Sequence, residues 1–209
     1  MTPYYHRDDV AIYHARCQDV FACGDAPVVQ TLITDPPYFG MEYALSVLTG
    51  RVPYDEAQDA QWLGHLCAWY REWLPLCREM IEMATGRAWI FASPVHLPAL
   101  ARTAHLIQWP MRQCWFAPES EALVQFGRPV PEALAAAVGQ AVAASRHPSR
   151  KEAAVLDAIV RASGDGAVLD PFAGHGGTLV AAKRAGLPAI GIDMDARACA
   201  AMVTAWEAA

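Results

Sequence analysis

Residues 167–178 read AVLDPFAGHGGT, which runs from an apolar strand through a glycine-rich turn into a helix. The glycines let the backbone bend tightly and approach a ligand where a Cβ would obstruct it. The helix that follows presents free N–H groups and the positive end of its dipole to a carboxylate or phosphate. We therefore predict a ligand-binding turn between a strand at 167–170 and a helix at 174–185.

The strand predicted after this turn ends in an acid. Residues 187–193 read LPAIGID, and the last of them is Asp193. An acid at this point can accept hydrogen bonds from both ribose hydroxyls of a nucleoside cofactor. An ordinary strand-to-helix turn is the alternative for the glycines alone. The complete order of strand, turn, helix, strand and acid favours the nucleoside-cofactor site.

A second motif, Asp35-Pro36-Pro37-Tyr38, follows the β-rich stretch 28–34. We expect a buried strand whose C-terminal end delivers the motif to the crevice where α/β proteins bind ligands. Prolines are stiff and lack N–H groups, so their carbonyls are fixed acceptors.

These acceptors suit one chemistry. The Asp35 carboxylate and the Pro36 carbonyl can accept both hydrogens of an amino group, and Tyr38 offers a flat face for a planar base. Such positioning favours attack by an aromatic amine on an electrophilic methyl group. A simple rigid turn after a strand is the alternative.

The remaining apolar patterns alternate between strands and helices. Strands are predicted at 10–13, 28–34, 87–92, 112–116, 122–126, 167–170 and 187–193, and helices at 55–85, 97–106, 131–144, 149–162, 174–185 and 196–207. Gly86 is expected to stop the longest helix, in which Trp62, Trp69 and Trp73 recur at helical spacing as core residues. This alternation predicts an α/β fold with a mostly parallel sheet covered on both faces.

The composition bounds the class of protein. A hydrophobic fraction of 54% and a charged fraction of 18% in 209 residues predict one globular domain over 1–209. No apolar run reaches the roughly 20 residues that cross a bilayer, and the N-terminus lacks the pattern of a signal peptide. The six cysteines show no metal-ligand or disulfide spacing. We expect a cytoplasmic protein without a metal or a membrane partner.

The net charge of −6 is unusual for a protein that binds nucleic acid through phosphate contacts. Lys151 and Lys183 are the only lysines, so the other basic residues are arginines, which suit bidentate phosphate contacts. The charge balance therefore neither establishes nor excludes a DNA substrate.

Together these motifs resemble the DNA amino-methyltransferases that modify adenine N6 or cytosine N4, in the β arrangement where the catalytic motif precedes the cofactor loop. The resemblance covers nearly the whole chain. It implies S-adenosyl-L-methionine as cofactor and a Rossmann-like class I methyltransferase fold with an antiparallel C-terminal hairpin in the sheet. By this likeness the catalytic residues are Asp35, Pro36, Pro37 and Tyr38.

The same resemblance assigns the cofactor site. The loop and the acid after it match at Asp170, Phe172, Gly174, Gly176, Thr178 and Asp193. A segment similar to the family's His-Pro-x-x-Lys-Pro pattern adds His147, Ser149 and Lys151, where it helps to enclose the methionine end of the cofactor.

The chain departs from the family pattern at several positions. Glu152 replaces a proline, and His175 and Gly177 replace the usual Ser and Thr of the loop. Arg16 stands where the family commonly has an Asp near the cofactor adenine, a role that Asp19 could take.

A larger departure concerns the DNA substrate. The connection between Trp115 and Glu121 leaves hardly any room for a target-recognition region. We therefore expect relaxed sequence specificity, a homodimer, or an accessory partner that holds the DNA.

The function expected from all of this is methylation of an exocyclic amino group in DNA, with the target base extruded from the duplex. Adenine N6 is favoured, because the cytosine enzymes of the family more often have Ser where Asp35 stands. The alternatives are cytosine N4, an RNA or protein-glutamine acceptor, and a non-catalytic nucleotide-binding subunit.

Overall fold

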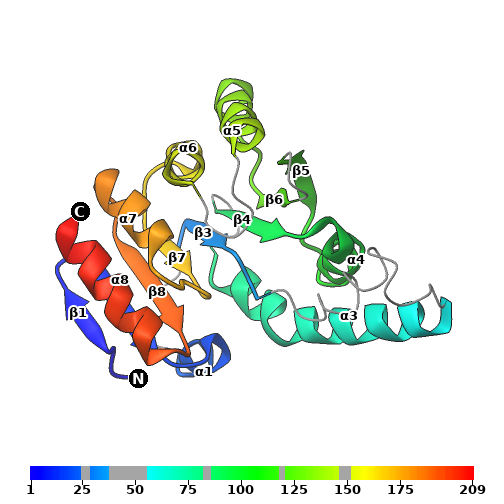
Figure 1. Cartoon of the computed structure of the whole chain (residues 1–209), viewed down its shortest axis with the longest axis horizontal. Coiled ribbons are helices and arrows are strands. Elements are labelled where there is room, and N and C mark those ends of the chain that lie inside the picture. The colour runs from blue at the N-terminus through cyan, green and yellow to red at the C-terminus, as the bar shows by residue number, and fades with distance from the viewer. Residues whose placement is uncertain (25–28, 38–55, 82–85, 118–120, 146–151) are drawn as a thin grey trace.

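The computed structural model describes residues 1–24, 29–37, 56–81, 86–117, 121–145 and 152–209 (Figure 1). The strands are β1 (Tyr5–Arg7), β2 (Val10–His14), β3 (Thr31–Thr34), β4 (Arg87–Ala92), β5 (Met111–Phe116), β6 (Ala122–Gly127), β7 (Val168–Asp170) and β8 (Ala189–Asp193). The α-helices are α1 (Cys17–Ala22), α3 (Glu56–Glu79), α4 (Leu97–Leu106), α5 (Glu132–Ala144), α6 (Ala153–Ser163), α7 (Gly177–Arg184) and α8 (Ala196–Ala208), and a 3₁₀ turn, η1, spans Pro94–His96.

All the described strands form one sheet in the order β1-β2-β8-β7-β3-β4-β6-β5. The central strands β2, β8, β7, β3 and β4 are parallel to their neighbours among these five, while β1, β6 and β5 pair antiparallel at the two sides. The mixed sheet with helices on both faces confirms the predicted α/β class (Figure 1).

Consecutive side chains of the central strands enter opposite layers of the core, as the period of two in a strand requires. Leu32 and Ile90 join the layer under α1, α3 and α4, whereas Ile33 and Trp89 join the layer under α6, α7 and α8. Because both faces are covered, β3 and β4 are buried along their whole length. This explains why Leu32-Ile33 in β3 and residues 88–92 in β4 are apolar without alternation.

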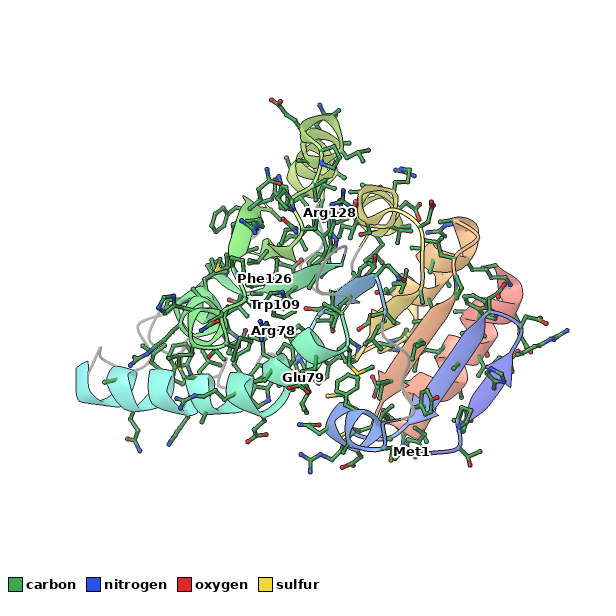
Figure 2. The ribbon with its side chains drawn as sticks, turned by 180° about the vertical axis from the view of Figure 1, so that it is seen from behind. Met1, Arg78, Glu79, Trp109, Phe126 and Arg128 are labelled. Atoms are coloured by element: carbon green, nitrogen blue, oxygen red, sulfur yellow. The ribbon has the colours of Figure 1, made fainter. Side chains whose placement is uncertain are left out.

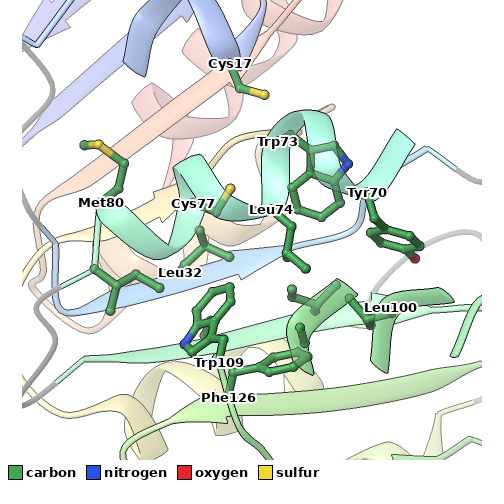
Figure 3. Close-up of a cluster of buried hydrophobic side chains, with 14 of the residues drawn as sticks. Cys17, Leu32, Tyr70, Trp73, Leu74, Cys77, Met80, Leu100, Trp109 and Phe126 are labelled. Carbon is green, nitrogen blue, oxygen red and sulfur yellow. The ribbon is translucent and has the colours of Figure 1, made fainter. Parts of the chain in front are cut away.

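The layer under α3 is rich in aromatic side chains (Figure 3). Tyr70 and Trp73 are fully buried, and Trp109 stacks on Phe126 with ring centroids 5.1 Å apart. Trp69 is partly buried and contacts the Trp73 ring edge-on. The tryptophans of α3 therefore serve the core, as their helical spacing predicted.

Most predicted elements are present with shifts of a few residues at their ends, and β1 and α1 were not predicted. The helix predicted at 55–85 ends at Glu79, well before Gly86. The reason is a competing partner: the amide of Val29 donates to the carbonyl of Met80 at 2.8 Å, and Val29 forms an isolated parallel bridge with Ile81. The chain therefore leaves the helix to run beside the approach to β3.

The antiparallel hairpin of the sheet is β5–β6, in the middle of the chain. The last two strands, β7 and β8, are parallel. The resemblance implied an antiparallel hairpin at the C-terminus, and the structure places the hairpin before β7 and β8 instead. In the described residues, no helix is long and apolar enough to cross a membrane.

The middle of the sheet contains a topological switch point. From β3 the chain crosses through α3 to β4 on one side, and from β7 it crosses through α7 to β8 on the other side. β3 and β7 are adjacent and parallel, with Thr31 opposite Val168. In open α/β sheets, the crevice beyond the carboxyl ends of two such strands is the usual ligand site.

Candidate functional site

A cavity of about 450 Å³ opens at the carboxyl ends of β3 and β7. Asp35 lines it from the end of β3. Four residues of the predicted cofactor loop line it from the end of β7, namely Asp170, Phe172, Gly174 and Thr178. We call this space the shared cavity, because two motifs far apart in sequence contribute to it.

Asp170 anchors the floor of the shared cavity. Its Oδ1 accepts hydrogen bonds from the Thr34 hydroxyl at 3.0 Å and from the Phe172 amide at 3.1 Å, and its side chain also bonds to Thr178. Burial raises the pKa of the Asp170 carboxyl to about 7; the nearby Asp35 carboxylate adds to the rise, and these hydrogen bonds oppose it. The Asp170 side chain is therefore held rigidly, and its hydrogen bond with Thr34 joins the end of β3 to the end of β7.

The glycine loop has the conformation that its sequence requires. Gly174 has a φ of +51° and Gly176 a φ of +84°, which other residues rarely adopt. A Cβ on Gly176 would lie 3.0 Å from the Met202 side chain, whereas one on Gly174 would meet no atom within 4 Å. Gly176 thus allows close packing onto α8, and Gly174 leaves the loop surface open toward the shared cavity that it lines.

Asp193 is hydrogen-bonded to the glycine loop and does not line the shared cavity. Its Oδ2 accepts a 2.9 Å hydrogen bond from the Gly174 amide, and its Oδ1 accepts one of 2.9 Å from the Asp195 amide. Each oxygen keeps a lone pair for a further donor. The structure therefore brings Asp193 to the glycine loop, and its contact with a ribose stays a prediction.

An aromatic wall supports the loop and Asp35 from the α3 side. The Phe172 ring meets Trp73 edge-on, with centroids 5.1 Å apart. Tyr70, one turn earlier in α3, lies close enough to Asp35 for the carboxylate to raise the pKa of its phenol, although burial is the larger cause. Tyr70 is in turn held by ring contacts with Trp69 and His96.

Some predicted residues lie away from the cavity wall or outside the described residues. Pro36 is buried, Pro37 is exposed, and neither they nor Gly176 and Asp193 line the shared cavity. Four predicted residues fall outside the described ranges: Tyr38, His147, Ser149 and Lys151. Their roles stay predictions.

Sequence reasoning missed three features of the site. Thr34 donates to Asp170, and its position just before Asp35 at a strand end was the available signal. Arg184 lines the cavity and binds the Asp157 carboxylate through Nη2 at 2.7 Å, a pairing across two helices that no local pattern announces. The exposed His175 also lines the cavity; the sequence singled it out among the histidines because it lies inside the cofactor loop, but assigned it no role.

Residues 109–204, which contain the glycine loop and Asp193, match the N6/N4 family described as DNA methylase. The resemblance to the DNA amino-methyltransferases is confirmed. The matched segment begins after Asp35 and does not include the Asp-Pro-Pro-Tyr motif, whose catalytic role stays a prediction.

Solved methyltransferase structures align with almost the whole chain. The cytosine-N4-specific PvuII DNA methyltransferase is 13% identical, with 98% of this chain and 89% of that chain covered and a TM-score of 0.70. A putative DNA modification methylase from Thermus thermophilus, in complex with S-adenosyl-L-methionine, is 18% identical, with 98% and 94% covered and a TM-score of 0.69.

A third structure, the complex of M1.HpyAVI with its cofactor SAM, is 16% identical, with 94% of this chain and 98% of that chain covered and a TM-score of 0.59. Identities of this size show a shared fold. The fold is therefore the Rossmann-like fold of the class I methyltransferases. No curated protein matches the chain in sequence.

Proposed function

We propose that this protein transfers a methyl group from S-adenosyl-L-methionine to an exocyclic amino group of a base in DNA, with adenine N6 as the favoured target. One observation carries the proposal: Asp35 and the glycine loop line the same cavity, at the ends of adjacent parallel strands. A cofactor on the loop and an amine on Asp35 would therefore face each other across one space.

The loop residues fit such a cofactor. A cavity of about 450 Å³ is within the range of sites for small molecules. Gly174 leaves the loop surface open, Phe172 adds an aromatic wall, and the buried Asp170 offers a carboxyl group to a cationic amine. Asp193, bound to the loop amide of Gly174, is placed to accept from ribose hydroxyls. When bound, the sulfonium group supplies an electrophilic methyl.

Asp35 would hold and activate the amine. Its carboxylate would accept one N–H hydrogen, and the carbonyl of Pro36, a residue that does not line the shared cavity, is the proposed acceptor of the other. Two such acceptors would draw the nitrogen lone pair out of conjugation with the ring. The nitrogen would then be placed to take the methyl group that the bound cofactor would supply, with the electrons of the carbon–sulfur bond leaving on sulfur. The proton that the amine sheds passes to Asp35 or to a water beside it. Positioning and electrostatics supply most of the effect, since both reactants are held in line.

Adenine is favoured by analogy alone, because Asp35 stands where the cytosine enzymes of the family more often have Ser. Cytosine N4 is the nearest alternative target. The carboxylate also argues against a protein-glutamine acceptor, for which the family motif usually begins with Asn.

The connection between β5 and β6 is too short to hold a target-recognition region. Only residues 117–121 connect β5 to β6, where relatives of this family usually carry a target-recognition region. We propose a single methyltransferase domain over 1–209 with relaxed sequence specificity, or with a second copy or an accessory partner that holds the DNA.

Incubation with methyl-labelled cofactor and unmodified duplex DNA, followed by nucleoside mass spectrometry, tests the proposal. We expect label in N6-methyladenine. Label in N4-methylcytosine would mean that the reaction is as proposed but the target base is cytosine. Label only in RNA would mean that the substrate is RNA and not DNA. Calorimetric cofactor binding without transfer to any nucleic acid would support the non-catalytic alternative and contradict the proposal.

A further inference from the structure

A second pocket lies at the opposite end of the central strands. Its volume is about 320 Å³, and its walls come from the end of α3, the start of β5, the segment that follows α4, and the turn after β6. Three arginines line it, Arg78, Arg112 and Arg128, and we call it the arginine pocket. Arg78, Arg128 and the neighbouring Trp109 are labelled in Figure 2.

Within the part of the chain that the structure describes, the positive charge of the arginine pocket has no acid beside it in the lining. Among the described residues that line it, none is Asp or Glu. None of the three arginines forms an ion pair with a described carboxylate, in contrast to Arg184 with Asp157. For a chain whose net charge is −6, three guanidinium groups around one cavity, none of them paired with a described carboxylate, are a marked local excess of positive charge.

The hydrogen bonds of these arginines leave donors free. Arg112 donates from Nε to the Gly127 carbonyl at 2.9 Å, which keeps its two Nη groups available. The Nε atom of Arg78 is buried and has no hydrogen-bond partner among the described residues. A buried donor left without an acceptor is costly, so an acceptor that enters the pocket gains from satisfying it.

A fourth arginine lies near the arginine pocket and holds two neighbouring segments together through hydrogen bonds. Arg87, at the start of β4, donates to the carbonyls of Ser163 at 2.9 Å and Pro129 at 3.1 Å, so its Nη groups are used in the structure itself. Burial lowers the pKa of Arg87, and the positive charge of Arg128 lowers it further. The two guanidinium groups repel each other across the turn that follows β6, and an anion would relieve this repulsion.

We propose that the arginine pocket binds a phosphate group. A phosphate carries more charge and more acceptor oxygens than a single carboxylate, and the planar guanidinium fork matches its geometry. The group can belong to a free phosphorylated small molecule or to a nucleic-acid backbone. The pocket is separate from the shared cavity: Thr31 pairs with Arg87, and Asp35 lies four residues further along, about 13 Å at the rise of a strand.

Titration of the full chain with pyrophosphate, followed by calorimetry at constant ionic strength, tests the proposal. We expect saturable binding by the wild-type protein. Arg78→Gln and Arg128→Gln should each weaken it about tenfold, since each removes a charge-assisted contact. Arg128 is exposed, so Arg128→Gln keeps the test valid if Arg78→Gln fails to fold. The matched control is Arg161→Gln on α6, which removes the same charge from an exposed site outside the pocket and should leave binding unchanged.

A short DNA duplex distinguishes the two sources of the phosphate. If the backbone is the ligand, Arg78→Gln and Arg128→Gln each lower duplex affinity and reduce its salt dependence by about one phosphate contact. If the ligand is a free small molecule, the variants lose pyrophosphate binding and keep their duplex affinity. The proposal is overturned if wild-type protein shows no saturable pyrophosphate binding, or if Arg161→Gln weakens it as much as the pocket variants do.

Discussion

The hydroxyl of Thr34 donates a 3.0 Å hydrogen bond to the carboxylate of Asp170. The bond joins the last residue of β3 to the last residue of β7, and both residues are almost completely buried. The next residue after Thr34 is Asp35, and the glycine loop begins after Asp170. One side-chain bond therefore fixes the distance between the proposed amine-binding group and the proposed cofactor loop.

Thr34→Val should destabilise the protein and slow methyl transfer. The substitution keeps the shape of the side chain but removes a buried donor, and we expect a loss of about 1–3 kcal/mol in the free energy of unfolding by urea. The matched control is Thr31→Val on the same strand, where the buried hydroxyl has no partner among the described residues. That change should be neutral or stabilising. Equal losses for the two variants would contradict the role given to the Thr34 bond.

The raised pKa of Asp170 makes a specific contribution to the pH dependence of stability. Burial moves this pKa from the ordinary value of 3.8 to about 7, so between these pH values the folded state binds more protons than the unfolded state. Linkage then requires the contribution of this group to stability to fall as pH rises from about 4 to about 7.

Urea unfolding at a series of pH values, for wild-type protein and Asp170→Asn, measures that contribution. The variant cannot ionise at this position, so the difference in unfolding free energy between the two proteins should change across the range and level off above pH 7. A constant difference would show that Asp170 ionises normally in the folded protein.

Gly174→Ala should weaken cofactor binding beyond what its small loss of folding stability explains. Its φ of +51° makes a Cβ costly by about 1 kcal/mol, and the added methyl group would occupy the open loop surface of the shared cavity. Gly186→Ala is the control, because Gly186 also has a positive φ and open surroundings but does not line the cavity. Thermal unfolding should show similar losses for both variants, and calorimetry with S-adenosyl-L-methionine should show weaker binding for Gly174→Ala alone. Unchanged binding of S-adenosyl-L-methionine by Gly174→Ala would contradict the assignment of the glycine loop to the cofactor site.

Tyr70→Phe should yield a more stable protein that transfers methyl groups more slowly. The Tyr70 hydroxyl is buried without a hydrogen-bond partner among the described residues, so its removal should raise the free energy of unfolding by about 1 kcal/mol. The Tyr70 phenol lies near Asp35, and we expect slower transfer because its dipole would no longer act on that carboxylate. Chemical denaturation and single-turnover transfer rates measure the two effects. A variant that is less stable, or one that is equally fast, would contradict this interpretation.

The sequence predicted the features that depend on local pattern. Apolar periods gave the strands and helices around the sheet, and the glycines of the loop predicted a tight turn where Gly174 and Gly176 have positive φ values. The two motifs predicted two strand ends. The structure places those ends beside each other, as the rule for parallel sheets led us to expect.

Features that depend on contacts between distant segments were not predictable. The early end of α3 results from pairing between Val29 and Ile81, and the Arg184–Asp157 pair joins two helices. The arginine pocket gathers side chains from α3, β5 and the turn after β6, so no sequence window contains it. Such features need the fold itself, because their partners are set by packing and not by spacing.

The most direct test of the central claim compares Asp35→Ala with wild-type protein in two measurements on the same preparations. Calorimetry measures the affinity for S-adenosyl-L-methionine, and mass spectrometry measures methylated nucleosides in DNA after incubation. We expect the variant to bind the cofactor with nearly wild-type affinity and to form no methylated base, since Asp35 would hold the amine and the loop would hold the cofactor. An Asp35→Ala variant that methylates DNA at the wild-type rate would contradict the account.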